Sequence, residues 1–304
     1  MKLIKPSFEI LSQSEGLNGI YKQIELAGRT CYKSEDKITE DSAKGFVDRM
    51  VKSGHGAMLE HGTVYLKVPN GKMYRDGAFR NFNEIFTDNL YYKICSKEET
   101  IYITTNYRYI IENNLEHWLD YLCEPTEHHE KRVTVKFICD RGVSHEFVRH
   151  RVFSFAQEST RYCNYSKDKF GNEITCILPP WLSENDLPKG FGYTSDDWGS
   201  LICEFYYEAT EKGKSEGFNI KPVRNFVFAL QTSEQLYFSL LKEGWKAQEA
   251  RSVLPNALKT ELVMTGSTSD WKHFFYLRTP VNAHPQAREL AIPLKEEFIK
   301  RNLI

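Results

Sequence analysis

The sequence predicts an α+β fold, in which helices pack against a sheet. Segments with the apolar periodicity of helices are mixed with short runs of β-branched and aromatic residues. No strand–helix unit repeats along the chain, which argues against a doubly wound sheet. The 304 residues, 41% of them hydrophobic, are enough to bury a full core in one large domain or two small ones.

The first half of the chain contains both kinds of segment. Residues 41–53 carry apolar side chains on one face and predict a helix, which Thr39 or Asp41 can cap. Runs rich in β-branched and aromatic residues predict strands at 63–68, 100–105 and 133–139. Residues 107–122 predict a helix, and the polar, turn-rich stretch 69–99 predicts an elaborated loop region.

The second half begins with a short helix predicted at 141–149, with Val143, Phe147 and Val148 facing inward. The segments predicted after it are a strand at 173–178, a surface loop at 184–195, long helices at 196–217 and 233–253, a short strand at 262–264, one or two helical turns at 271–277 and a terminal helix at 286–301.

Charge and hydropathy exclude some classes of function. The formal net charge is −1, so no global field favours nucleic acid, and anion binding must come from local clusters. No apolar run approaches the roughly 20 residues that span a bilayer. The first residues lack the apolar core of a signal peptide. We therefore expect a cytoplasmic protein with no membrane and no nucleic-acid partner.

The seven cysteines do not predict a disulfide framework or a structural zinc site, because their number is odd and no Cys-x-x-Cys occurs. Residues 127–130, Glu-His-His-Glu, place two histidines side by side. Adjacent side chains point in different directions on a helix or a strand, so a shared metal ion is not expected there. We interpret this run as solvated surface and predict no metal site.

The most informative stretch is 149–162, where three arginines stand among hydroxyl and aromatic side chains. The guanidinium groups repel one another unless anions neutralise them, and they suit phosphate oxygens. A solvated basic loop is one interpretation, but the interleaved polar and aromatic groups favour a phosphorylated ligand. Glycine-rich dinucleotide and P-loop motifs are absent, so side chains must hold the phosphates of any bound nucleotide.

These residues also resemble a known family. Arg149-His150-Arg151, seven intervening residues and Ser159 form a pattern similar to the signature of the flavin-dependent thymidylate synthases, and Arg161-Tyr162 continues it. Similar segments occur at 29–32, 54–61 and 250–255, and at Leu277-Arg278. The resemblance covers residues ~25–68 and 133–302. It implies one domain over residues 1–304, with an insertion at 69–132.

The resemblance implies an antiparallel sheet packed with helices and a specific reaction. Members of the family convert dUMP to dTMP, with methylenetetrahydrofolate as carbon donor, FAD as hydride carrier and NADPH as reductant. They are homotetramers whose active sites are shared between subunits. We therefore expect dUMP, folate and NADPH as partners, and a homotetramer.

The resemblance also assigns binding residues by position. The residues expected to contact FAD are Ala57, Arg149, His150, Arg151, Gln157, Ser267, Thr268, Ser269 and His273. The residues expected to contact dUMP are Glu146, Arg149, Gln157, Glu158, Ser159, Thr160, Arg161, Arg251 and Arg278. Arg278 is the predicted catalytic residue. Because a guanidinium is a poor proton acceptor, its expected role is to stabilise negative charge on the uracil.

The chain departs from the family pattern at Ala156, Ser267 and His273. These departures leave room for a catalytically inactive homologue that keeps the fold. A nucleotide- or RNA-binding module that uses the arginines on phosphates is a further alternative, although the near-zero net charge weighs against it.

Overall fold

The computed structural model describes residues 1–69, 91–182 and 222–304. The helix predicted at 196–217 and the loop predicted at 184–195 lie outside the described residues. The chain divides into two compact units. Unit 1 comprises Met1–Lys5, Asp140–Gly142 and Thr160–Lys259, and unit 2 comprises Pro6–Cys139, Val143–Ser159 and Thr260–Ile304.

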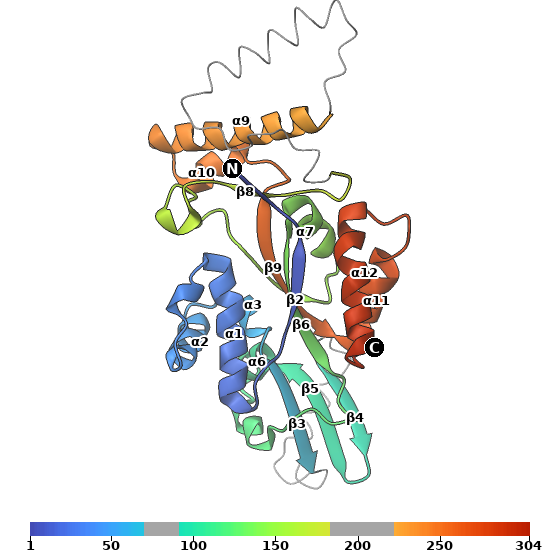
Figure 1. Cartoon of the computed structure of the whole chain (residues 1–304). Helices are drawn as coiled ribbons and strands as arrows, with labels where there is room; N and C mark the ends of the chain where they lie inside the picture. Colours follow the sequence, from blue (N-terminus) through green and yellow to red (C-terminus); the bar gives the residue numbers. More distant parts are fainter. Residues whose placement is uncertain (70–90, 183–221) are drawn as a thin grey trace, which may run out of the picture. The chain divides into compact units, whose positions relative to one another are not determined.

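Unit 2 contains a four-stranded sheet with the strand order β2-β6-β9-β7, of which β2, β6 and β9 are labelled in Figure 1. Its strands are β2 (Ser7–Leu11), β6 (Arg132–Asp140), β7 (Ser154–Gln157) and β9 (Lys259–Ser267). β2 runs antiparallel to β6 with Ser7 opposite Ile138, and β7 runs antiparallel to β9 with Ser154 opposite Thr265.

Both faces of this sheet are covered, as the alternation of side chains along its strands requires. Leu262 and Met264 of β9 belong to one hydrophobic cluster, together with Phe137 of β6, whereas Val263 belongs to another. The first cluster includes Trp271, Phe274 and Phe275, and also the carboxyl-terminal helix. The helices that contribute to it are α7 (Arg141–Phe147), α11 (Thr268–Arg278) and α12 (Pro285–Lys300).

The helix α1 (Gly16–Tyr32) packs on both sheets of unit 2. Its Ala27 lies against Ala156 and Val263 of the four-stranded sheet. Its Ile20 and Ile24 lie in a cluster with Val64, Leu66 and Ile103 of a second, three-stranded antiparallel sheet of order β3-β5-β4. The strands of that sheet are β3 (Thr63–Pro69), β4 (Lys93–Lys97) and β5 (Thr100–Asn106).

Short helices complete unit 2. They are η1 (Glu35–Lys37), α2 (Ser42–Lys52), α3 (Gly56–Leu59), α6 (Tyr107–Glu112) and η2 (Glu116–Tyr121). α2 crosses α1 closely at Gly28, where a Cβ atom would lie 2.5 Å from the Phe46 ring. A side chain larger than hydrogen at Gly28 would therefore require the Phe46 ring to move.

Unit 1 has its own hydrophobic cluster, which includes Cys163, Tyr165, Ile174 and Tyr237. Strands β1 (Lys2–Ile4) and β8 (Thr175–Ile177) pair in parallel. The helices are η3 (Asp168–Phe170), α9 (Pro222–Lys242), α10 (Ala247–Ala250) and η7 (Arg251–Val253). None of the helices in the described parts of either unit is both long and apolar enough to cross a bilayer.

The α+β prediction is confirmed, and so are the strands predicted at 63–68, 100–105 and 133–139. The helix predicted at 107–122 is wrong in extent, because Asn114 adopts a left-handed φ of 55° that separates α6 from η2. The helix predicted at 233–253 is also misplaced. α9 ends at Lys242, and Gly244 follows with a φ of 96°.

The stretch 69–99, predicted as a loop region, contains strand β4 at Lys93–Lys97. Its residues 70–90 lie outside the described parts of the chain. The sequence did not predict β4, because the strand begins and ends with polar side chains and shows no alternation of apolar and polar residues.

Candidate functional site

The Arg-His-Arg motif lies in the turn between α7 and β7. Val143 and Phe147 are buried and hold α7 in the core, as predicted. The inward orientation predicted for Val148 is wrong, because α7 ends at Phe147 and Val148 is 37% exposed. The His150 N–H donates to Phe147 O at 3.1 Å, and the helix therefore ends at the motif. This turn leaves Arg149 and Arg151 exposed and buries His150, which is only 6% exposed. Neither of the two arginine side chains has a hydrogen bond or ion pair with another described residue.

Arg278 is held at the carboxyl end of α11 by three hydrogen bonds. Its Nη1 donates to Glu146 Oε2 at 2.5 Å, its Nη2 to Glu146 O at 2.7 Å and its Nε to His150 Nε2 at 3.0 Å. A cation at this position also complements the helix dipole. The side chains of Arg278 and Glu146 are 14% and 35% exposed, so the pair opens to solvent on the Glu146 side. We call Glu146, His150 and Arg278 the Arg278 cluster.

The environment of His150 keeps its imidazole neutral. Burial, together with the positive charge of Arg278, lowers the pKa of His150 to about 4. A guanidinium has only donors, so His150 Nε2 accepts the bond from Arg278 and the ring carries its proton on Nδ1. The cluster therefore presents a positive guanidinium next to a neutral histidine.

This pKa shift predicts a loss of stability in acid. In the unfolded chain His150 takes up a proton near pH 6.5, whereas in the folded protein it does so only near pH 4. The free energy of unfolding should therefore fall as the pH drops from about 6.5 to 4, by at most about 1.4 kcal/mol per pH unit for this group. Burial also lowers the pKa of His61, to about 3, which adds a decrease in the same direction.

Urea unfolding at pH 7, 6 and 5 measures this effect. His150→Gln should flatten the pH dependence without abolishing it, because His61 remains. His145→Gln is the matched control, because His145 is exposed on α7, which directly precedes the turn that carries His150. Equal slopes for the wild type and His150→Gln would show that His150 does not titrate as expected.

The residues after β7 are fixed by α1 and β9. The Glu158 N–H donates to Glu261 O at 2.8 Å, and the Ser159 N–H donates to Cys31 O at 2.9 Å. Gln157 is turned inward, where its Nε2 donates to Ser144 Oγ at 2.8 Å and to Thr260 Oγ1 at 3.2 Å. The backbone at Ser159 is therefore rigidly placed, while the Gln157 amide already has partners inside unit 2.

Three predicted dUMP contacts, Thr160, Arg161 and Arg251, belong to unit 1. Arg251 is exposed at the start of η7, and its Nη1 donates to Thr160 Oγ1 at 3.1 Å. The guanidinium of Arg161 lies over the Tyr162 ring, 5.5 Å from its centroid. The structure therefore brings Arg251 to Thr160, 91 residues away in the sequence.

The residues 267–269 form the capped start of α11. The Ser267 Oγ accepts from the Asp270 N–H, and the Asp270 carboxylate accepts from the Ser267 N–H at 2.9 Å, which is a capping box. Glu130 Oε1 accepts from the Thr268 hydroxyl at 3.1 Å and from the Ser269 N–H at 2.9 Å. These polar groups therefore already have internal partners.

The other two predicted flavin contacts, His273 and Ala57, are exposed. The ring centroid of His273 lies 6.4 Å from that of His150, so His273 borders the Arg278 cluster. Ala57 lies on α3, a single helical turn that packs against β7.

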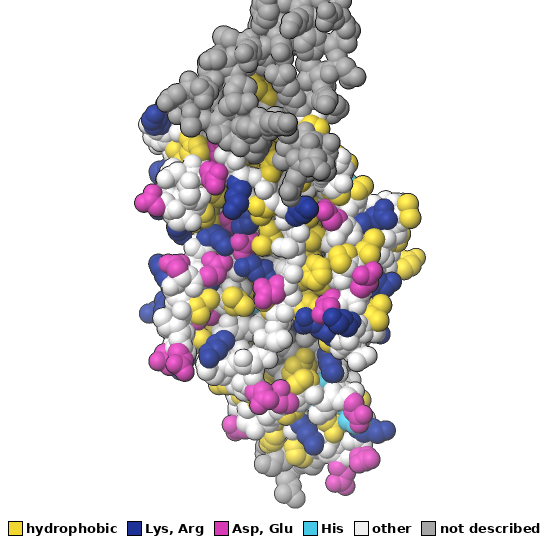
Figure 2. Space-filling model, in the orientation of Figure 1, with side chains coloured by type: hydrophobic (Ala, Val, Ile, Leu, Met, Phe, Trp, Pro, Cys, Tyr) yellow, Lys and Arg dark blue, Asp and Glu magenta, His cyan; other side chains and the backbone are white. Residues whose placement is uncertain are grey.

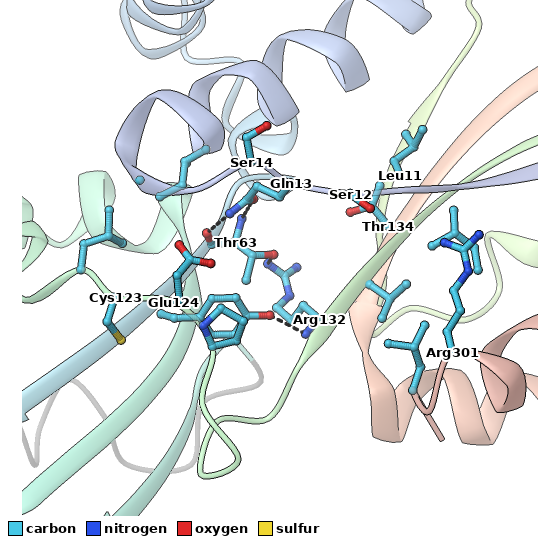
Figure 3. A pocket seen from close by; sticks show the side chains of 18 residues that line it. Leu11, Ser12, Gln13, Ser14, Thr63, Cys123, Glu124, Arg132, Thr134 and Arg301 are labelled. Carbon is cyan, nitrogen blue, oxygen red and sulfur yellow. Dashed lines mark hydrogen bonds between the residues drawn. The ribbon is translucent and has the colours of Figure 1, made fainter.

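Described residues of unit 2 line at least two cavities. One of about 230 Å³ brings together Arg151 and Ser267, two of the predicted flavin contacts. The other, of about 270 Å³, contains none of the predicted residues (Figure 3). In it, Gln13 and the backbone of Thr63 are joined by reciprocal hydrogen bonds, both of 2.8 Å. Arg132 lines both cavities.

The sequence analysis missed Arg132 and Lys93, which line the cavity of Arg151 and Ser267. The only sequence signal for Arg132 is a cation directly before a predicted strand. Lys93 has no signal, because its strand was predicted as loop. Among the residues that the structure describes, no three His, Cys, Asp or Glu side chains are grouped as metal ligands would be.

Comparison with known proteins places this geometry in context. The model of the thymidylate synthase complementing protein family matches residues 89–301. The chain is 24% identical over 283 residues to the flavin-dependent thymidylate synthase of Corynebacterium aurimucosum, covering 92% of this chain and 74% of that one. It is 23% identical over 278 residues to the enzyme of the same name from Mycolicibacterium vanbaalenii, covering 91% and 74%.

The chain also aligns with a solved structure. The crystal structure of the UMP/dUMP methylase PolB from Streptomyces cacaoi bound with 5-Br dUMP aligns with a TM-score of 0.41 and 17% identity. The alignment covers 99% of this chain and 93% of that one.

Proposed function

Because the chain belongs to the thymidylate synthase complementing protein family, we propose that it is a flavin-dependent thymidylate synthase. The proposed reaction is the reductive methylation of dUMP to dTMP, with methylenetetrahydrofolate as carbon donor and NADPH as reductant. The observation that carries the proposal is the family match over residues 89–301, which includes the Arg149–Arg151 motif and Arg278. The Arg278 cluster supports it, because it joins these two segments by direct hydrogen bonds.

The residues present fit an FAD site. Arg151 and Ser267 line one cavity, and the Arg149 and Arg151 side chains have no partner among the described residues, so both are available to an anionic ligand. When bound, FAD supplies the hydride for the methylation. The proposed FAD contacts are Ala57, Arg149, His150, Arg151, Gln157, Ser267, Thr268, Ser269 and His273.

Several of these contacts require an exchange of hydrogen bonds. The Gln157 amide would have to leave Ser144 and Thr260. To donate to FAD, the hydroxyls at 267 and 268 would have to leave Asp270 and Glu130. Arg149 and Arg151 require no such exchange, so we propose that they are the principal flavin contacts.

For dUMP we propose the contacts that the family resemblance assigns. The proposed residues are Glu146, Arg149, Gln157, Glu158, Ser159, Thr160, Arg161, Arg251 and Arg278. Arg161 and Arg251 are exposed cations, which suit the nucleotide phosphate. Glu158 is almost fully buried, so its contribution is to hold the loop that carries Ser159.

Arg278 is the proposed catalytic residue. Its guanidinium cannot accept a proton, but it can stabilise negative charge that develops on the uracil. His150 beside it is neutral, so it adds no second positive charge next to the guanidinium. Its ring nitrogen accepts the hydrogen bond from Arg278 Nε and so fixes the plane of the guanidinium. Glu146 weakens the positive charge of the site in the absence of substrate, because its carboxylate partly neutralises Arg278.

The surface weighs against a nucleic-acid-binding module. On the face shown in Figure 2, Lys and Arg side chains are interspersed with Asp and Glu and do not form a basic stripe. The formal net charge of −1 agrees with this distribution. A catalytically inactive homologue is the remaining alternative, and the enzyme assay below separates it from an active enzyme.

We also propose the assembly and location that the family resemblance implies. These are a homotetramer whose active sites are shared between subunits, and a place in the cytoplasm. We propose that the segment 69–132 is an insertion into a single domain over residues 1–304. Light scattering of the purified protein measures the number of subunits.

The proposed function predicts that the protein with FAD, NADPH, methylenetetrahydrofolate and dUMP forms dTMP, detected by chromatography. Addition of dUMP should also perturb the flavin absorption spectrum. Omission of FAD or of dUMP should abolish product. Protein that binds FAD but forms no dTMP would support the inactive homologue, and a colourless protein that binds RNA with a steep salt dependence would support the nucleic-acid-binding module.

A further inference from the structure

The cavity of Arg151 and Ser267 has a second wall that the proposed function does not use. This wall consists of residues from β4 and β5, which lie between β3 and β6 in the sequence, together with Arg132 at the start of β6. The volume of about 230 Å³ is below the range of roughly 300–1,000 Å³ of sites that enclose a whole drug-sized ligand. The cavity therefore suits one part of a dinucleotide.

The register of the sheet places three polar side chains of this wall on one face. Lys93 of β4 lies opposite Thr104 of β5, and directly paired residues point to the same side of a sheet. Asn106 follows Thr104 by two residues and therefore also shares that face. All three line the cavity.

The buried hydroxyl of Thr104 is evidence for a ligand in the cavity. Thr104 is 2% exposed, and its Oγ1 has no hydrogen-bond partner among the described residues. Leaving a buried hydroxyl without a partner costs about 1–3 kcal/mol, so native proteins rarely do so. A ligand atom in the cavity would satisfy this hydroxyl.

The charged groups around the cavity differ in how they are bound. The three carboxylates are each engaged: Glu60 with Arg108 at 2.7 Å, Asp270 with Ser267, and Glu130 with the start of α11. The Lys93 and Arg151 side chains have no hydrogen bond or ion pair with any described residue. The cavity is lined by equal numbers of positive and negative side chains, but the charged side chains without a partner among the described residues are positive.

Arg132 is the third cation. Its guanidinium donates to Glu60 O at 3.1 Å and makes longer contacts of 3.4 Å with Thr63 Oγ1 and Ser154 Oγ. Burial lowers its pKa, which reflects the cost of holding this charge away from water. Within the described residues it has no ion pair with a carboxylate. An anion in the cavity would offset that cost.

We propose that β4, β5 and Arg132 form the second wall of the dinucleotide pocket, where Lys93, Thr104 and Arg132 bind a diphosphate opposite Arg151. The inference rests on the proposed function, because that function places a dinucleotide at Arg151 and Ser267. FAD and NADPH both carry a diphosphate, so the test includes both.

The test compares three single variants with the wild-type protein. Lys93→Gln removes one cation, and Thr104→Val removes only the hydroxyl while keeping the shape of the side chain. Lys97→Gln is the matched control, because Lys97 lies four residues further along the same exposed strand and does not line the cavity. FAD affinity is measured by flavin fluorescence, and NADP⁺ affinity by calorimetry with the FAD-loaded protein.

Lys93→Gln and Thr104→Val should each weaken the binding of one dinucleotide, FAD or NADP⁺, about tenfold or more, and Lys97→Gln should not. The melting temperature of ligand-free Thr104→Val should stay equal or rise, because the variant removes an unsatisfied hydroxyl. If the wild type binds FAD and forms dTMP while both variants bind both dinucleotides as tightly as it does, the diphosphate site is wrong and the proposed function survives. Variants that weaken only the binding of folate would also overturn the diphosphate site. A wild-type protein that does not bind FAD would overturn the proposed function itself.

Discussion

Replacement of Arg278 with alanine is expected to lower kcat for dTMP formation by about 10²–10³, the effect typical of removing one group that stabilises charge in a transition state. The physical reason is that Arg278 is held in place before substrate binds, by Glu146 and by the neutral His150. A preorganised cation needs no rearrangement when negative charge develops on the uracil. Steady-state kinetics with saturating dUMP measures the loss.

Two further variants separate charge from structure at this position. Arg278→Lys keeps the charge but cannot make all three hydrogen bonds, so we expect an intermediate kcat. Glu146→Gln keeps a side-chain acceptor for Arg278 and should retain kcat within several-fold. FAD absorbance should be unchanged in all three. Wild-type kcat in Arg278→Ala would remove Arg278 from the mechanism, and an equal loss in Glu146→Gln would make the ion pair a structural element.

Replacement of Arg251 with glutamine is expected to weaken dUMP binding about 10- to 100-fold, because a hydrogen bond to a charged group contributes about 1.5–3 kcal/mol. Arg251 is exposed, and its bond to Thr160 Oγ1 aims the guanidinium from η7. Titration of the FAD-loaded protein with dUMP, followed by the flavin spectrum, measures the affinity. FAD affinity should not change, because none of the proposed FAD contacts lies in unit 1.

Thr160→Val tests whether that bond positions Arg251. It should weaken dUMP binding less than Arg251→Gln does. A double variant no weaker than Arg251→Gln alone would show that Thr160 acts only by positioning Arg251, and a weaker one would show that Thr160 also contacts dUMP itself. Lys242→Gln, at the end of α9 in the same unit, is the control for the loss of a positive charge. Equal dUMP affinity in Arg251→Gln and the wild type would exclude Arg251 from the phosphate site.

The sequence predicted the local segments of the fold better than their extent. β3, β5 and β6 were found because each combines β-branched residues with a buried face. The helix predicted at 107–122 failed because its apolar pattern continues across Asn114, whose left-handed conformation breaks the helix. α9 was placed too late, since its pattern runs on through Gly244. β4 carries no apolar pattern and owes its conformation to pairing with β5.

The candidate site was predicted mainly through family resemblance rather than from spacing. Arg149–Arg151 and Ser159 lie close together in the sequence, so their pattern can be recognised directly. The contact between Arg278 and Glu146 spans 132 residues, and nothing in either local segment indicates it. The internal partners of Gln157 and of residues 267–269 were also not predictable, because they depend on how α7, α11 and β9 pack.

The amino-acid sequence alone determined the α+β class, the family pattern at 149–162 and the residue types available for anion binding. Each of these properties is local or compositional, so it is written in neighbouring residues. Only the tertiary structure decided that Arg278 meets His150, that Thr104 is buried without a partner and that Lys93 shares its face. These relations depend on strand register and helix packing, which arise from contacts between distant segments and change by a whole face when a strand shifts by one residue.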